Sequence, residues 1–212
     1  MGWQDMPLQE ASERSDFTYY AFISYSRKDS KEAKWLQKRL EWFRYPVKLV
    51  KEQARPLHRQ YVRPIYRDKT NLEVDKESYW TNIRLAIEAS RFLIVVCSPD
   101  SARSNAVEQE VRHFLSTRKG GIDMLVPVIL RGTVGTGDVD ECLCPALAEL
   151  GTAITSRNLP TMTPDERGLV SEGWEDGFIA VVAYLLGLRR QELGDHVRRE
   201  ARRKVMQARA LA

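Results

Sequence analysis

The fold of this chain is decided by residues 87–99, which read Ile87-Glu88-Ala89-Ser90-Arg91-Phe92-Leu93-Ile94-Val95-Val96-Cys97-Ser98-Pro99. The run from Phe92 to Cys97 is apolar throughout, as expected for a parallel strand that is covered on both faces. Ser98-Pro99 is a turn signal that ends this strand. Apolar residues at helical spacing follow over residues 104–116, so the segment predicts a strand, a short loop and then a helix.

The same alternation of strand and helix extends along the chain on both sides of this segment. Further strands are predicted at residues 19–24, 64–68 and 124–130, with a weak fifth at 152–155. Further helices are predicted at residues 30–43, 77–89 and 174–186, with a long exposed connection at 45–63. This order is typical of an α/β fold: a flavodoxin-like three-layer sandwich with a central parallel sheet.

Two local details refine the prediction. Asp29 and Glu32 stand three residues apart before a helical pattern, which predicts a capping box with Asp29 as the N-cap. Pro127 lies inside the fourth strand and cannot donate a ladder hydrogen bond, so that strand is expected at the sheet edge or at a bulge.

The charge pattern divides the chain into three parts. Residues 1–16 form a polar leader, expected to be flexible, and residues 17–187 form the α/β domain. Residues 188–212 form a basic helical tail or linker with eight Lys or Arg against three acids. The rest of the chain has 25 basic and 26 acidic residues, so the net charge of +4 belongs to the tail.

Composition points to a cytoplasmic protein. Apolar residues make up 43% and charged residues 29% of the 212, which is ordinary for a globular domain. No secretory signal is evident, and the apolar run near residues 178–186 is too short to span a bilayer. Three cysteines fit a reducing compartment, and Cys142-x-Cys144 lacks a second ligand pair, so no metal site is expected.

Glu110 is the best candidate for chemistry in this chain. Its helix follows the strongest predicted strand, so the helix is delivered to the carboxyl edge of the sheet, where open α/β folds bind ligands. Glu110 lies at the margin of an apolar stripe that includes Val107 and Val111. The alternative interpretation is a solvated acid on the helix face beside Arg112 and His113.

Four blocks of sequence resemble the Toll/interleukin-1 receptor (TIR) domain family, and they occur in the family's order over roughly residues 18–187. They are Phe22-Ile23-Ser24-Tyr25-Ser26-Arg27-Lys28-Asp29, Tyr66-Arg67-Asp68 with Leu72-Glu73, the segment 87–99, and Val126-Pro127-Val128-Ile129. The resemblance is greatest to bacterial TIR domains of the NAD-cleaving type. In those enzymes a helix motif of Trp, three residues and Glu provides the catalytic carboxylate; here Glu110 matches the Glu and Ala106 replaces the Trp.

The resemblance also implies a set of substrate-binding residues. They are Ser24, Tyr25, Arg27, Leu72, Glu73, Tyr79, Trp80 and Ser98. Arg27 is also compatible with an ordinary surface arginine, and Ser98 is also compatible with a residue that opens a turn. For Tyr79 and Trp80 the favoured interpretation is packing of their helix against the sheet. Asp68 is expected to accept hydrogen bonds in the following loop. Asp75 stands where the family commonly has glycine.

The resemblance implies an NAD+ nucleosidase that releases nicotinamide and ADP-ribose or a cyclic form, with NAD+ as substrate and no cofactor. Expected partners are other TIR domains in a homo-oligomer or filament, with a C-terminal sensor or membrane module as a further candidate. A role in antiphage or stress signalling is expected. The alternative is a non-catalytic adaptor that associates through homotypic TIR contacts. A third, weaker hypothesis is a regulator whose basic tail binds nucleic acid or a membrane surface; the net charge of −1 outside the tail argues against it, and nucleic-acid binding is not expected.

Overall fold

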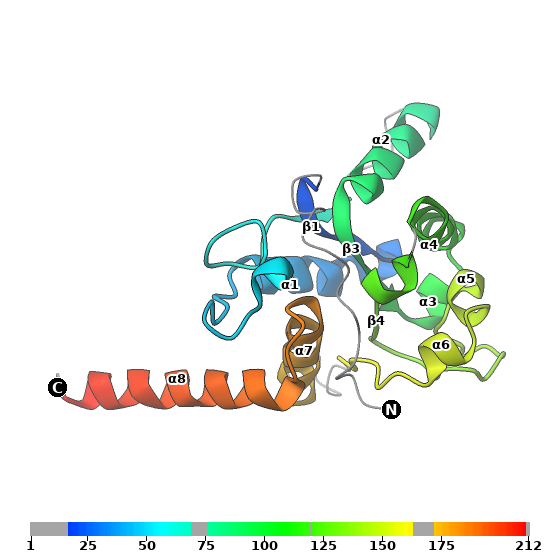
Figure 1. Cartoon of the computed structure of the whole chain (residues 1–212). Helices are drawn as coiled ribbons and strands as arrows, with labels where there is room; N and C mark the ends of the chain where they lie inside the picture. The colour runs from blue at the N-terminus through cyan, green and yellow to red at the C-terminus, as the bar shows by residue number, and fades with distance from the viewer. Residues whose placement is uncertain (1–16, 69–75, 119, 163–171, 211–212) are drawn as a thin grey trace.

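The computed structural model describes residues 17–68, 76–118, 120–162 and 172–210 (Figure 1). The strands are β1 (Tyr19–Ser24), β2 (Ile65–Arg67), β3 (Ser90–Cys97) and β4 (Leu125–Ile129). The longer helices are α1 (Ser30–Glu41), α2 (Lys76–Glu88), α4 (Asn105–Thr117), α7 (Glu172–Leu185) and α8 (Arg190–Ala210). Shorter helical segments are η2 (Arg27–Asp29), η3 (Glu52–Ala54), α3 (Pro99–Ala102), η4 (Gly121–Met124), α5 (Pro145–Ala148) and α6 (Thr152–Thr155).

The four strands form one parallel sheet in the order β2-β1-β3-β4. From β1 the chain moves to β2 on one side, and from β2 it crosses over β1 to reach β3 on the other side, so the topological switch lies between β1 and β3. Such a switch opens a crevice at the carboxyl ends of the strands. The predicted α/β sandwich is therefore confirmed, and its ligand edge is defined.

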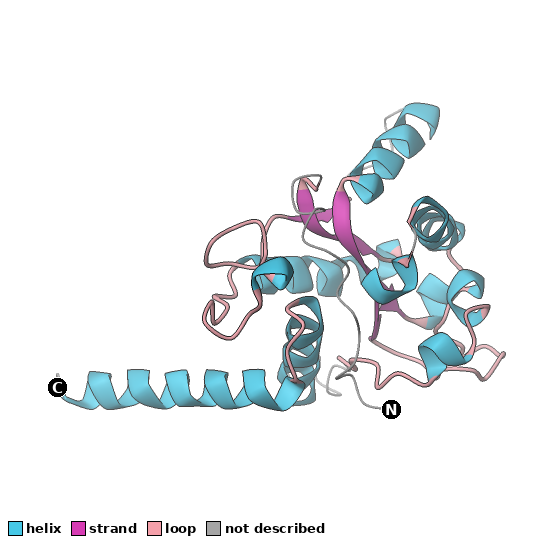
Figure 2. Ribbon diagram, in the orientation of Figure 1, coloured by secondary structure: helices cyan, strands magenta, loops and turns pink. Residues whose placement is uncertain are grey.

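Helices cover both faces of the sheet, as Figure 2 shows. On one face α1 and α7 pack against alternate residues of the central strands, including Ile94 and Val96 of β3. On the other face α2 and α4 pack against Leu93 and Val95. Because side chains alternate along a strand, the continuous apolar run predicted for β3 serves both cores.

Two predictions of local structure were wrong. Residues 152–155, predicted as a weak strand, form the short helix α6, in which Thr155 N donates to Gly151 O at 3.0 Å. A single parallel bridge from Ile129 to Thr161 lies beside β4 instead. Asp29 stands at the N-cap of α1 but makes no side-chain cap hydrogen bond, because its carboxylate is used elsewhere.

Other expectations were confirmed within a few residues. Pro127 lies in β4, an edge strand of the four-stranded sheet. The connection at 45–63 contains only the short helical segment η3. The predicted leader at 1–16 lies outside the described residues. Within the described part of the chain, no helix is both long and apolar enough to cross a membrane.

Candidate active site

The carboxyl ends of β1, β2 and β3 bring polar side chains to one edge of the sheet. Ser24 is the last residue of β1, Asp68 follows β2 and Ser98 follows β3. β1 lies between the other two strands, and the register pairs Ile23 with both Arg67 and Ile94. Residues from three distant segments therefore meet at the crevice predicted for a parallel sheet.

Glu110 reaches this edge from α4 and is buried, with 6% of its surface exposed. Ser24 Oγ donates a hydrogen bond to Glu110 Oε2 at 2.5 Å. Burial raises the pKa of Glu110 to about 8; the Ser24 hydrogen bond opposes this rise and the nearby charge of Asp68 adds to it. The interpretation of Glu110 as a solvated acid is wrong: the residue lies at the margin of the apolar stripe, but its side chain is buried.

Local sequence explains why α4 presents Glu110 inward. Ser98 and Ser101 form a capping box on α3, and Ser104 caps α4 by accepting from Val107 N at 3.4 Å. These caps set the direction in which α4 enters the fold. Val107 and Val111 are fully buried on either side of Glu110, so burying the apolar stripe also buries the carboxyl group.

The described residues place no cation against this carboxyl group. Among the residues that the structure describes, no lysine, arginine or histidine forms an ion pair or hydrogen bond with Glu110. A carboxyl group buried without a cation titrates near neutral pH and binds a positive charge favourably. The site can therefore stabilise a cationic ligand.

A chain of hydrogen bonds borders Glu110 on the side of β2. Tyr79 of α2 donates to Asp68 Oδ2 at 2.5 Å, and Tyr25 donates to the backbone oxygen of Asp68 at 2.5 Å. Arg67 donates to the Tyr25 hydroxyl at 2.9 Å. The Asp68 carboxylate thus accepts a hydrogen bond from the Tyr79 side chain. Burial raises the pKa of both Tyr25 and Tyr79, and the charge of Glu110 adds to the rise.

Arg27 is exposed in η2. Burial raises the pKa of Tyr79 and the charge of Arg27 slightly opposes that rise, which places the guanidinium within electrostatic reach of the Asp68 side of the site. It makes no hydrogen bond or ion pair with any described residue. Lys28 points to solvent, as expected, and pairs with Asp100 at 2.8 Å. Arg27 is thus available to a ligand phosphate, and its binding role stays a prediction.

Ser98 is fully buried and engaged with protein groups. Its hydroxyl donates to Asp29 Oδ2 at 2.6 Å and accepts from Ser101 N at 3.1 Å. Asp29 is itself fully buried and also binds the Arg131 guanidinium. These contacts account for Ser98 without a ligand, so its substrate-binding role stays a prediction.

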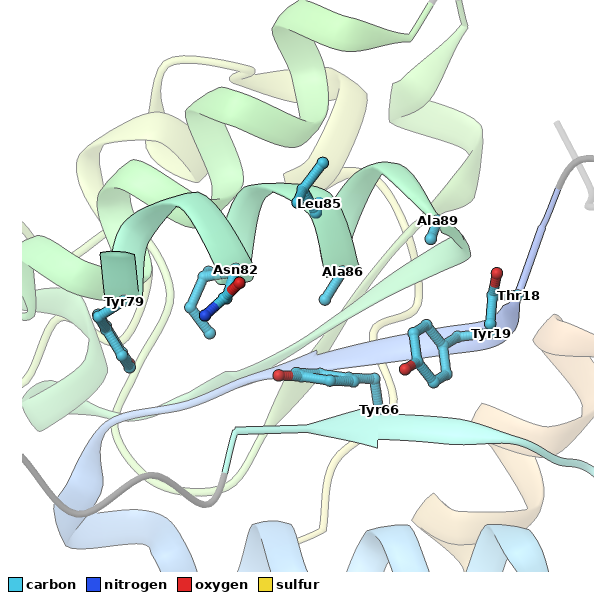
Figure 3. Close-up of a pocket in the computed structure, with 9 residues that line it drawn as sticks. Thr18, Tyr19, Tyr66, Tyr79, Asn82, Leu85, Ala86 and Ala89 are labelled. Atoms are coloured by element: carbon cyan, nitrogen blue, oxygen red, sulfur yellow. The ribbon is translucent and has the colours of Figure 1, made fainter. Parts of the chain in front are cut away.

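Tyr79 and Trp80 pack against the core on the α2 side of the sheet, with ring centroids 5.9 Å apart. This is the packing interpretation favoured from the sequence. A hollow of about 480 Å³ lies between α2 and the strands β1 and β2 and meets the site at Tyr79. Figure 3 shows Tyr19 and Tyr66 beneath Asn82 and Ala86, so the hollow follows from small α2 side chains opposite tyrosine rings. It extends away from Glu110 and does not define the reacting position.

Sequence reasoning missed two parts of this edge. The pairing of Asp29 with Arg131 joins residues 102 apart, and no local pattern announces it. The Tyr79–Asp68 hydrogen bond joins α2 to the residue after β2.

Leu72 and Glu73, predicted to bind substrate, lie outside the described residues, as does Asp75. Among the described residues, no three His, Cys, Asp or Glu side chains are grouped to hold a metal ion.

Comparison with known proteins defines the class. The family model for the TIR domain matches residues 21–150, so this chain belongs to the TIR domain family. One curated relative is the protein named NAD(+) hydrolase ApTIR, from an Actinoplanes species. It is 35% identical over 127 residues, a stretch that covers 58% of this chain and 16% of the relative. The aligned region is therefore a small part of that relative's length.

Proposed function

We propose that this chain is a TIR-domain NAD+ nucleosidase that cleaves the bond between nicotinamide and ribose, with Glu110 as the catalytic carboxylate. The observation that carries the proposal is a buried carboxyl group at the carboxyl edge of the sheet of a TIR domain, with no cationic partner in the described part of the chain. The name of the ApTIR relative supports the choice of reaction.

The chemistry suits a single carboxylate. The nicotinamide ring of NAD+ carries a positive charge, so it leaves as a neutral molecule and the charge passes to the ribose as an oxocarbenium-like centre. A carboxylate in a low-dielectric site stabilises that developing charge, as in glycoside hydrolysis. Water then adds to the ribose carbon and releases a proton, which gives ADP-ribose; attack by an adenine nitrogen gives a cyclic product.

Binding of the substrate and ionisation of Glu110 support each other. At neutral pH the free protein holds Glu110 largely protonated, because burial raises its pKa to about 8. A pyridinium ribose beside the carboxyl group favours the ionised form and lowers this pKa. Ser24 holds the carboxyl in position, and Arg27 is available for a phosphate of the same substrate.

The reaction needs no cofactor in this proposal, since NAD+ is the substrate. We assign it to the cytoplasm, which suits three cysteines that form no disulfide. We further propose that the chain is active when self-associated and that it serves bacterial immune or stress signalling.

A non-catalytic adaptor is the alternative, because Ala106, one turn before Glu110 on α4, leaves that side of the carboxyl group without the family's aromatic wall.

An NAD+ cleavage assay by chromatography at high protein concentration tests the proposal. Glu110→Gln keeps the shape of the side chain and removes its charge, and we expect cleavage to fall by about 10³-fold. Glu108→Gln is the matched control, because Glu108 lies on the same helix and binds Arg112 and Ala146 N instead. Equal activity of wild type and Glu110→Gln would overturn the assignment of Glu110 as the catalytic residue. A wild-type protein that is inactive in a verified oligomer would favour the alternative of a non-catalytic adaptor.

A further inference from the structure

The basic residues of this chain are concentrated in two segments. Residues 42–63 carry six Lys or Arg and one acid, and residues 188–212 carry eight and three, so each segment has a net charge of +5. The remaining residues carry 19 basic and 25 acidic side chains, a net charge of −6. The near-neutral balance outside the tail therefore conceals a second basic segment within the domain.

The two segments lie on the same face of the sheet. Both contribute side chains to the core on the α1 and α7 side, Tyr45 and Val62 from the connection and Leu193 from α8. The Tyr20 hydroxyl is bonded to Ala54 O at 2.8 Å and to Leu185 O at 2.5 Å, which joins the connection to the end of α7. In Figure 1 both the connection, in cyan, and α8, in orange to red, project from that side of the domain.

Most cations in the second half of α8 lie away from the domain. Leu193 is buried and Val197 packs on the core, so their side of the helix faces the protein. At about 100° per residue, Arg198, Arg199 and Arg202 lie on the opposite side and Arg203 lies on the flank, and all four are exposed. Arg190, in the first turn, instead pairs with Asp176 of α7 at 3.3 Å.

These cations are poorly compensated within the protein. Arg198 pairs with Asp195 at 2.8 Å, but Arg199, Arg202 and Arg203 form no ion pair with any described residue. The spacings 198/202 and 199/203 place like charges one turn apart, which destabilises an isolated helix. An anionic surface outside the protein would convert this repulsion into attraction.

The connection adds apolar side chains to its charges. Trp42 is 75% exposed, Leu57 is 42% exposed and Val47 is 36% exposed. Exposed cations accompany them in the same segment: Arg44, Lys48, Lys51 and Arg59. Tryptophan and aliphatic residues among lysines and arginines are the composition of surfaces that lie in a membrane interface.

We propose that residues 42–63, which comprise the connection 45–63 and the three residues before it, form with helix α8 a surface that binds an anionic lipid bilayer. Arginines and lysines would contact the headgroups, while Trp42, Val47 and Leu57 enter the boundary with the acyl chains. Nucleic acid is less well matched, because binding to unpaired bases uses aromatic stacking and Val47 and Leu57 offer none. The proposal does not depend on the enzymatic activity, so either can fail alone.

Sedimentation of the whole chain with vesicles tests this surface. The chain should partition onto phosphatidylcholine vesicles that contain phosphatidylserine and not onto phosphatidylcholine alone, and added salt should weaken the binding. Each cation near an anionic surface contributes about a fivefold factor, so Arg202→Gln with Arg203→Gln should lower the partition coefficient by about 25-fold.

Matched variants distinguish the effect of this surface from the effect of the net charge of the chain. Arg84→Gln with Arg103→Gln removes the same charge from exposed positions on α2 and just after α3, and it should leave partition unchanged. Trp42→Ala should weaken binding without changing its dependence on salt. Circular dichroism confirms that each variant is folded. Equal loss in both arginine pairs, no dependence on phosphatidylserine, or tighter binding to duplex DNA than to the vesicles would each overturn the proposal.

Discussion

Two carboxyl groups, Asp29 and Glu110, are buried at the same edge of the sheet, and their surroundings differ in one respect. Asp29 is bound by the Arg131 guanidinium and by Ser98 Oγ at 2.6 Å. Glu110 is bound by Ser24 Oγ at 2.5 Å and by no cation among the described residues. Each carboxyl group receives a serine hydroxyl, so the arginine is the difference.

That difference separates a structural carboxylate from a binding one. Asp29 joins the residues that follow β1, β3 and β4, because its partners Ser98 and Arg131 come from the other two strand ends. Burial raises the pKa of Asp29 as well, but the Ser98 hydrogen bond and the Arg131 guanidinium oppose that rise, so its carboxylate already has a cation within the protein. Among the described residues no cation binds Glu110, so its carboxyl group is open to a cationic ligand, and in the proposed reaction the nicotinamide riboside supplies that charge.

The largest expected effect concerns stability against pH. The folded pKa of Glu110 is about 8 and its ordinary value is 4.5, so the folded state holds the proton more tightly than the unfolded chain. Stability from this group is complete below pH 4.5 and is lost as pH rises through 8. Between pH 4 and pH 9, wild type should lose about 4 to 5 kcal/mol relative to Glu110→Gln.

Denaturant unfolding of the two proteins across this pH range measures that loss. The difference between them isolates Glu110, because every other titrating group is common to both. A constant difference across the range would mean that Glu110 titrates normally in the folded protein. It would also remove the contrast with Asp29.

The Asp29 site should respond to loss of its arginine. Arg131→Met leaves a buried carboxylate without its cation, and breaking such a pair is strongly destabilising. Because the Arg131 side chain is 40% exposed, we expect a cost of about 2 to 3 kcal/mol, below the full value for a buried pair. Thermal unfolding at neutral pH measures it.

Arg103→Met is the control for that substitution, since Arg103 pairs with Asp100 at 3.7 Å on the surface and should cost little. If Arg131→Met unfolds at the same temperature as wild type, the arginine is not what balances Asp29. The two carboxyl groups would then be more alike than their contacts indicate.

The fold was largely readable from local pattern, and the site only in part. The six residues of β1 were predicted with their bounds because an unbroken apolar run has few alternatives. Glu110 was located because helix spacing and strand order are both visible in sequence. Its depth was not, since a residue at the margin of an apolar stripe is buried or solvated depending on what packs beside it.

The Asp29 network was invisible to the same reasoning for a physical reason. Its bonds join residues 69 and 102 apart in the chain, and each partner taken alone has an ordinary local role. Asp29 beside Glu32 suggested a capping box, and Ser98 beside Pro99 suggested a turn. Only the assembled sheet brings the three strand ends together, so the tertiary contact replaced the predicted local one.

The Ser24 hydrogen bond should set the acidity of Glu110. Donation from Ser24 Oγ favours the ionised carboxylate, so Ser24→Ala should raise the pKa of Glu110 above 8. A hydrogen bond to a charged group is worth about 1.5 kcal/mol, which corresponds to about one pH unit. If NAD+ is cleaved, kcat/KM should rise with pH to its plateau, and the midpoint should move upward in the variant. A midpoint that falls instead would mean that Ser24 favours the protonated form.

Asp68 should have the smallest effect, in the opposite direction. Its charge raises the pKa of Glu110, so Asp68→Asn should lower the midpoint of the same profile. A like charge acting partly through solvent shifts a pKa by about half a unit.

Tyr79→Phe separates the effect of the Asp68 charge from the effect of its position, because it removes the 2.5 Å hydrogen bond to Asp68 and keeps both the carboxylate and the ring. If Tyr79→Phe moves the midpoint as far as Asp68→Asn does, the placement of Asp68 controls Glu110 more than its charge. Asp68 would then act as a positioning residue that α2 holds in place. Neighbouring charges would then affect the pKa of Glu110 less than the Arg131 charge affects the pKa of Asp29.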